Sequence, residues 1–150
     1  MNTGHPFVEL LERPSLNRNV IPLDEQASAE AVGMLGERFV KRPRSSWWWE
    51  HVRDGLPQST YVPPNDDGYL LIPTICPDQS VLFFVLDDNP PPWRAYQAKP
   101  SDLAGLLAEC PAFEYIVADP GGEWLLMENH HGMLMAVGEP VASALARHDA

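Results

Sequence analysis

The clearest pattern in the chain is a continuous hydrophobic run, Ser80–Leu86, with turn-favouring residues on both sides. Its seven residues are too few for a typical helix. The absence of alternating polar positions is typical of a strand that is covered on both faces. The run therefore predicts a central β-strand.

The longest stretch with a regular pattern of apolar segments and turns lies between Phe113 and Val137. The mostly apolar residues 113–118 are followed by the turn sequence Asp119–Gly122, and a second stretch with an apolar centre runs from Glu123 to Asn129. Gly132 allows another sharp turn before Met133–Val137. Hydrophobic stretches of this length separated by Gly, Pro and Asp predict consecutive antiparallel strands. We expect a three-strand β-meander in the same sheet as Ser80–Leu86.

Helical patterns occur in three places. Asp24 is a good N-cap, apolar residues recur at helical spacing as far as Phe39, and Pro43 stops the pattern. Ser101 or Asp102 is expected to cap a second helix, which ends before Pro111. A short final helix is predicted over 140–147, with Ala142, Leu145 and Ala146 facing inward.

Shorter elements are also predicted. Residues 69–73 and the region around Tyr96 suggest short strands. Residues 1–22 are expected to be an extended N-terminal segment, in which Phe7, Val8, Leu10 and Leu11 form one helical turn against the body. Together these patterns predict an α+β fold in one domain, 1–150. It would be an antiparallel-rich sheet with a C-terminal β-meander and helices packed on it.

Charge is distributed unevenly in this chain of 150 residues, whose net charge is −11. Residues 1–53 contain seven acidic and seven basic residues, so they contribute nothing to the net charge. Residues 54–149 contain fourteen acidic residues and only three basic ones, and they carry all of it. Such a surface repels nucleic acid and anionic membranes, and it attracts a basic protein. Simple solubility is the alternative explanation.

The composition also limits the protein's location. The N-terminus has no basic segment followed by an apolar one, and no apolar run approaches about 20 residues. We therefore expect a cytoplasmic protein with no membrane partner. Cys76 and Cys110 lie outside any CxxC or metal-finger pattern, which indicates reduced, half-buried thiols and no bound cofactor or metal.

Three adjacent indoles, Trp47, Trp48 and Trp49, cannot all point the same way in a regular structure. At least one is expected at the surface. With Arg44 and Arg53 nearby they could stack on nucleic-acid bases, but the net negative charge of the rest of the chain argues against that. Core packing combined with a protein-interface anchor is the preferred interpretation.

The sequence Glu128-Asn129-His130-His131 is the most distinctive polar cluster. In an extended strand Glu128 and His130 would share one face, so the carboxylate could fix the imidazole as in a general base. A metal site is a further reading, but adjacent strand histidines diverge, which argues against it. Polar groups that stabilise a tight turn, and contact with a partner, are the remaining interpretations. The chain has no P-loop, GxGxxG or GxSxG signature, so no catalytic residue is predicted.

Other candidate contacts are acidic or aromatic. Two pairs of adjacent acids, Asp66-Asp67 and Asp87-Asp88, could bind a divalent cation. They lack the spacing of an EF-hand loop, however, and are more typical of solvated turns. If the partner is basic, its contacts are expected among Asp66, Asp67, Asp87, Asp88, Trp93, Glu123, Glu128 and His130.

The segment 113–138, with its Glu-Tyr, Trp-Leu-Leu and Glu-Asn-His-His sequences, resembles a family of small bacterial proteins that carry this last motif. Some members of that family look like immunity proteins, which neutralise antibacterial toxins. The resemblance implies a protein that binds a cognate toxin and is not an enzyme. The alternatives are a small hydrolase-like enzyme that uses Glu128 and His130, and a cytosolic adaptor.

Overall fold

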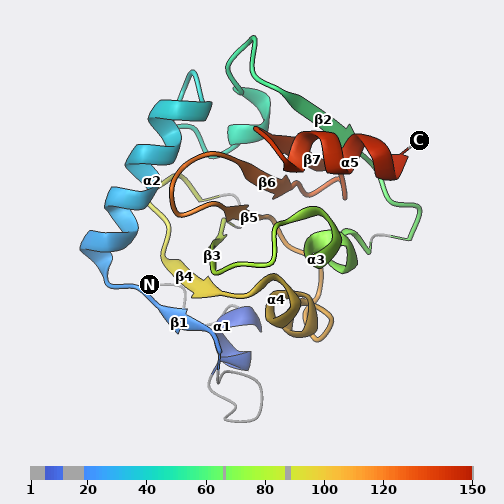
Figure 1. The fold of residues 1–150 in the computed structure, drawn as a ribbon. Helices are drawn as coiled ribbons and strands as arrows, with labels where there is room; N and C mark the ends of the chain where they lie inside the picture. Colours follow the sequence, from blue (N-terminus) through green and yellow to red (C-terminus); the bar gives the residue numbers. More distant parts are fainter. Residues whose placement is uncertain (1–5, 12–18, 66, 87–88, 150) are drawn as a thin grey trace.

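The computed structural model describes residues 6–11, 19–65, 67–86 and 89–149, with only the backbone of Asp149. Its centre is a seven-stranded antiparallel sheet in the order β1-β4-β3-β5-β6-β7-β2 (Figure 1). The strands are β1 (Ile21–Pro22), β2 (Gln58–Tyr61), β3 (Val81–Val85), β4 (Ala95–Ala98), β5 (Tyr115–Ala118), β6 (Leu125–Glu128) and β7 (Leu134–Val137). The predicted α+β fold, the β3 strand and the adjacent β5-β6-β7 meander are confirmed.

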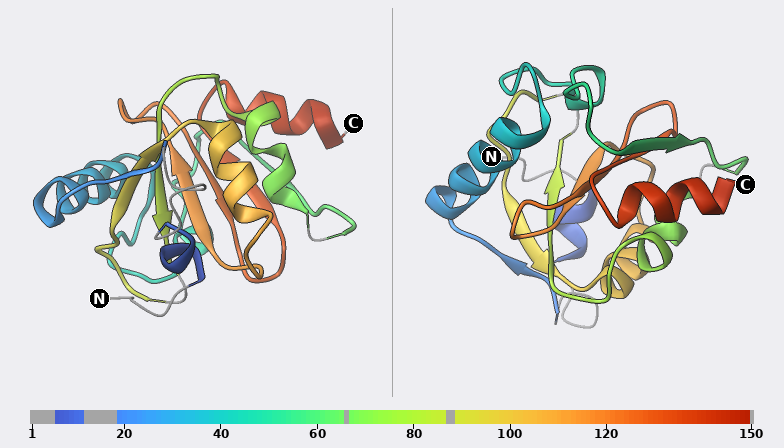
Figure 2. Two further views of the ribbon diagram at one scale, coloured as in Figure 1. Left: turned by 90° about the horizontal axis from the view of Figure 1, so that it is seen from below. Right: turned by 45° about the horizontal axis from the view of Figure 1, so that its top comes forward.

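Helices cover both faces of this sheet, because the central strands are apolar on both sides. They are α1 (Pro6–Leu10), α2 (Glu25–Phe39), α3 (Ile72–Ile75), α4 (Pro100–Leu107) and α5 (Val141–Asp149), with the 3-10 turns η1 (Trp48–Glu50) and η2 (Gly68–Leu71). Side chains of α2 and η1 form one core, and α1, α3, α4 and α5 cover the opposite face. Figure 2 shows α2 separated from α3, α4 and α5 by the sheet.

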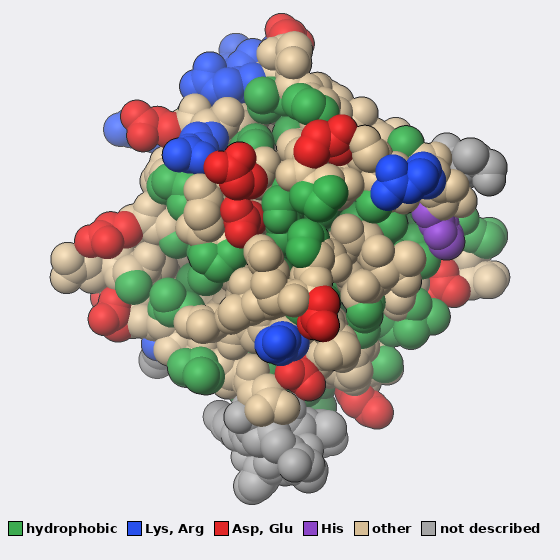
Figure 3. Space-filling model, viewed as in Figure 1, with side chains coloured by type: hydrophobic (Ala, Val, Ile, Leu, Met, Phe, Trp, Pro, Cys, Tyr) green, Lys and Arg blue, Asp and Glu red, His purple; other side chains and the backbone are tan. Residues whose placement is uncertain are grey.

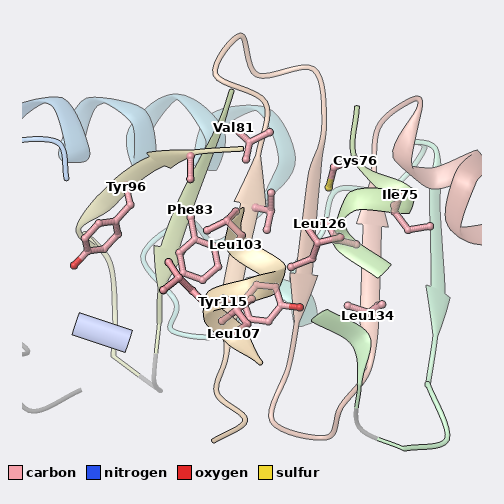
Figure 4. Packing of buried hydrophobic residues seen from close by; sticks show 14 of the residues in the cluster. Ile75, Cys76, Val81, Phe83, Tyr96, Leu103, Leu107, Tyr115, Leu126 and Leu134 are labelled. Atoms are coloured by element: carbon pink, nitrogen blue, oxygen red, sulfur yellow. The ribbon is translucent and has the colours of Figure 1, made fainter. Parts of the chain in front are cut away.

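In the core between the sheet and the helices α1, α3, α4 and α5, every second residue of the central strands is packed. Phe83, Tyr115 and Leu126 come from three neighbouring strands, and Leu103 and Leu107 of α4 pack over them (Figure 4). Intervening strand residues point to the α2 face instead, as the two-residue period of a strand requires. Each of the two cores therefore takes alternate positions of the same strands.

The predicted helix starts are partly confirmed. Asp24 caps α2, since its Oδ1 accepts the backbone N–H of Ala27 at 2.7 Å. The N-terminal helical turn also forms, and Phe7 is fully buried. The second helix begins at Pro100 with Lys99 as its N-cap, two residues before Ser101 and three before Asp102, the caps that were expected. In α5, Leu145 is buried but Ala146 is exposed.

One local prediction is wrong, and one strand was missed. Residues 69–73 are helical rather than extended, because Ile72 and Ile75, three positions apart, bury themselves together and Pro73 lies in the first turn, where it is tolerated. Strand β2 was not predicted at all. Its sequence Gln-Ser-Thr-Tyr is polar, and it becomes a strand by pairing with β7 at the edge of the sheet.

Candidate functional site

The turn between β6 and β7 is formed by the side chain of Asn129. Its Oδ1 accepts the backbone N–H groups of His131 at 2.9 Å and Met133 at 3.0 Å. Gly132 adopts a positive φ of 74°, which glycine tolerates best. Asn129 is itself buried. The turn is therefore fixed from inside, and it projects His130 and His131 outward, where both are exposed.

His130 is positioned by Glu114, which immediately precedes β5. Oε2 of Glu114 accepts the backbone N–H of His130 at 3.0 Å and lies 2.7 Å from the ring Nδ1. A carboxylate can only accept, so Nδ1 is the donor in this pair. Glu114 is 3% exposed, whereas the His130 side chain is 44% exposed. A buried acid thus orients an imidazole that remains accessible from outside.

The predicted pairing of Glu128 with His130 is wrong. Oε1 of Glu128 accepts a hydrogen bond from the hydroxyl of Tyr115 at 2.7 Å, inside the protein. Strand β6 ends at Glu128, so the strict alternation that would place the two side chains on one face does not continue to His130. Burial and the neighbouring Glu128 carboxylate raise the pKa of Tyr115 well above its ordinary value. Glu128 therefore belongs to the interior.

Two of the three adjacent indoles lie beside the histidines. The ring centroid of Trp49 is 5.8 Å from that of His130 and 6.1 Å from that of His131, and the Trp47 centroid is 6.3 Å from that of His130. Trp47 is 40% exposed. We call Trp47, Trp49, His130 and His131 the aromatic–histidine patch. The prediction that at least one indole reaches the surface is confirmed.

The middle indole has the opposite role. Trp48 is 1% exposed, and its ring packs edge-on against that of Trp93 at 5.0 Å. Its Nε1 donates to the carbonyl of Pro43. Trp93, one of the expected partner contacts, is 5% exposed and packs in the core, where its Nε1 donates to the carbonyl of Asn89. Its ring also lines the open groove described below.

Two of the predicted acidic contacts are described on separate elements. Asp67 is half-buried beside the start of η2, and Glu123 is exposed in the β5–β6 hairpin. Asp66, Asp87 and Asp88 lie outside the described residues. The face drawn in Figure 3 shows acidic groups dispersed among apolar and basic ones, without a single acidic surface.

Two cavities lie away from the patch. An open groove of about 1000 Å³ is lined by residues that include Ser28, Trp93, Arg94 and Tyr96. A smaller cavity of about 80 Å³ adjoins Glu128 and Tyr115 beneath Cys110. No patch residue lines either one. The aromatic–histidine patch therefore lies outside both of these cavities.

Metal ligation and membrane insertion can be assessed for the described ranges. There, no three His, Cys, Asp or Glu side chains are arranged to hold a metal ion. In the same part of the chain, no helix has the length and apolar character needed to cross a bilayer. Both cysteines are free thiols: Cys76 is buried and Cys110 partly so.

A family model matches residues 21–148, which includes every part of the patch. The chain belongs to the family of unknown function DUF6756. No curated protein and no solved structure matches it. The family therefore adds no activity to the description, and the site must be interpreted from its own geometry.

Glu114 is the residue of this site that sequence reasoning missed. One signal was present, because an acid stands between Phe113 and Tyr115 in an otherwise apolar stretch. An acid in such a position is buried only when it has hydrogen-bond donors. Its donors come from residue 130, sixteen positions away, and only the pairing of β5 with β6 brings them together.

Proposed function

We propose that this protein binds another protein through the aromatic–histidine patch, in the manner of an immunity protein that neutralises a toxin. The observation that supports this most directly is the exposure of Trp47 beside His130. A large indole that is 40% exposed lies beside the His130 imidazole, which buried Glu114 holds, on a turn whose backbone buried Asn129 holds, and this arrangement suits a binding surface. Tryptophan is enriched among the residues that dominate binding energy at interfaces.

Charge supports a basic partner. The excess of acidic residues in 54–149 would speed the approach of a positively charged protein without fixing where it docks. In this proposal the dispersed acids, Asp67 and Glu123 among them, act on the association rate. The patch supplies the short-range contacts that determine the dissociation rate.

The first test is whether a toxin domain is encoded next to this gene, and such a domain is then the binding partner to use. We expect the two proteins to form a complex, and Trp47→Ala to weaken it by about 30-fold or more, as is typical of a hot-spot residue. Glu123→Lys should slow association, and it should do so less at high salt. A matched control is Leu70→Ala, an exposed apolar residue outside the patch. The immunity proposal would be refuted if the two proteins did not bind and if this protein did not restore the growth of cells that express the toxin.

A catalytic alternative rests on one observation, the 2.7 Å contact between Glu114 and His130. An imidazole oriented by a carboxylate is the arrangement of a general base. Across the described ranges, however, no hydroxyl or thiol side chain hydrogen-bonds to His130, so a nucleophile would have to be water. Hydrolysis of p-nitrophenyl acetate that is lost in His130→Gln, but kept in His148→Gln, would favour this alternative.

A further inference from the structure

We infer that the aromatic–histidine patch recognises a cationic side chain, specifically an arginine guanidinium presented by the partner. This inference rests on the proposed binding function and specifies the chemistry of the contact. It follows from three observations: a buried carboxylate beneath the patch, the orientation of the His130 ring, and the exposed indole beside it.

The first observation is the state of Glu114. Its Oε2 is engaged twice by His130, whereas its Oε1 is buried and makes no hydrogen bond within the described protein. A buried carboxylate with an unused acceptor is unfavourable, and it places negative potential directly under the exposed imidazole. Since Oε1 is buried, a docked group cannot bond to it, but the potential of the carboxylate attracts a positive group to the patch above it.

The second observation concerns His130. Because Nδ1 donates to Glu114, the lone pair of the neutral ring lies on Nε2, the nitrogen that is not held by the acid. Nε2 is then an acceptor for an N–H group. A guanidinium carries five N–H donors and no acceptor, so it matches the neutral form of this ring.

The third observation is the arrangement of the rings. The ring centroids of Trp47 and Trp49 lie 6.4 Å apart, and those of Trp47 and Trp49 lie 6.3 Å and 5.8 Å from that of His130, so the three rings pack against one another. A ligand must therefore stack on the outside, where Trp47 is 40% exposed. Guanidinium groups stack on indole faces through cation–π attraction, which is strongest for tryptophan.

Basic residues of this chain near the indoles could compete with such a contact. Arg38 donates to the carbonyls of 121 and 122, Lys41 pairs with Asp54, and Nε of Arg53 donates to the carbonyl of Glu37. These three cations are therefore engaged elsewhere. Arg42 and Arg44 are exposed on the loop before Trp47. Because these two arginines would attract negative charge, the main competing interpretation is that the patch binds an anionic group of the partner.

The test is an NMR titration of the intact protein with N-acetyl-arginine methylamide. N-acetyl-citrulline methylamide has nearly the same shape but no charge, and it serves as the matched ligand control. We expect saturable shifts of the Trp47 indole N–H and the His130 ring signals. Arginine should bind about two- to fivefold more tightly than citrulline, which is the gain expected from an exposed cation–π contact. Trp47→Ala should abolish this preference, whereas Leu70→Ala should keep it.

Several results would overturn the inference. Equal affinity for arginine and citrulline would remove the role of charge, and tighter binding of N-acetyl-glutamate methylamide would assign the patch to an anionic group. A preference for arginine that survives in Trp47→Ala would place the contact elsewhere. The titration uses no toxin, so a negative result refutes the arginine inference without deciding whether the protein binds a toxin. Conversely, a protein that binds no toxin but prefers arginine would refute the proposed function and keep the arginine inference.

Discussion

Oε2 of Glu114 lies 2.7 Å from Nδ1 of His130 and accepts the backbone N–H of the same residue at 3.0 Å. One buried acid thus fixes both the main chain and the side chain of a residue in the next hairpin. The contact joins the start of β5 to the β6–β7 turn, and it determines how the turn presents its imidazoles.

Removing this acid should destabilise the protein. Glu114→Ala leaves the His130 amide without its partner, and we expect the free energy of unfolding to fall by about 1–3 kcal/mol. Glu114→Gln, which keeps an acceptor, should lose less. Urea unfolding measures both variants, with the exposed Glu37→Ala as a control that stays within about 0.5 kcal/mol of the wild type. A Glu114→Ala variant as stable as this control would contradict the structural role.

Asn129 should stabilise the same turn through its own hydrogen bonds to the backbone. Asn129→Ala removes the acceptor of two backbone N–H groups, so a loss of about 1–3 kcal/mol is expected. Asn129→Asp keeps the acceptor oxygen and should be milder. Hydrogen exchange of the His131 and Met133 amides provides the direct readout. Unchanged protection of both amides in the alanine variant would show that the side chain does not fix the turn.

Replacing the adjacent residues Trp47 and Trp48 by alanine should affect stability to very different extents. Trp48→Ala removes a buried ring that packs on Trp93, and it should cost about 3–5 kcal/mol of stability. Trp47→Ala removes a partly exposed ring and should cost much less, while weakening partner binding. Thermal unfolding followed by circular dichroism distinguishes the two. Equal losses would mean that Trp47 is structural.

Gly36 should be intolerant of a side chain, although it lies within a helix where alanine is normally favoured. A Cβ at this position would lie 2.7 Å from Cβ of Pro43 and 3.3 Å from the Trp48 ring. Gly36→Ala is therefore expected to displace the segment that leads to Trp47 and to lower stability. Gly33→Ala is the matched control, because its Cβ would meet nothing within 4 Å and should stabilise α2 by about 0.5–1 kcal/mol. Stabilisation by both substitutions would contradict this packing.

Alkaline pH should destabilise the fold. Burial raises the pKa of the Cys76 thiol to about 12, and the pKa of Tyr115 is also raised. The folded state therefore retains protons that the unfolded chain releases above about pH 8.5 for the thiol and about pH 10 for the phenol. Stability from these groups is complete below those values and is lost as pH rises toward the folded pKa values.

Urea midpoints at pH 7.5, 9 and 10 test this expectation. Cys76→Ala should lower the midpoint at pH 7.5 through lost packing, but its midpoint should fall less steeply with pH than that of the wild type. Parallel pH profiles for the two proteins would show that the thiol does not contribute.

The sequence determined the elements whose own pattern is sufficient. The unbroken apolar run of β3, the turn-separated strands of the meander and the Asp24 cap are local features, and burial or hydrogen bonding follows from them directly. Hence the α+β class and the adjacency of β5, β6 and β7 were predictable. The exposure of one indole was predictable too, because adjacent residues in a chain cannot all face the same core.

The tertiary structure decided everything that depends on partners distant in sequence. Strand β2 is polar and becomes a strand only beside β7, and residues 69–73 are helical because Ile72 and Ile75 bury themselves in the same core. The site changed for the same reason. Local spacing paired Glu128 with His130, but β6 ends at Glu128 and the sheet brings Glu114 to the imidazole instead. Spacing along a strand describes neighbours within that strand, whereas hydrogen-bond partners across a sheet are set by its register, which only the folded chain specifies.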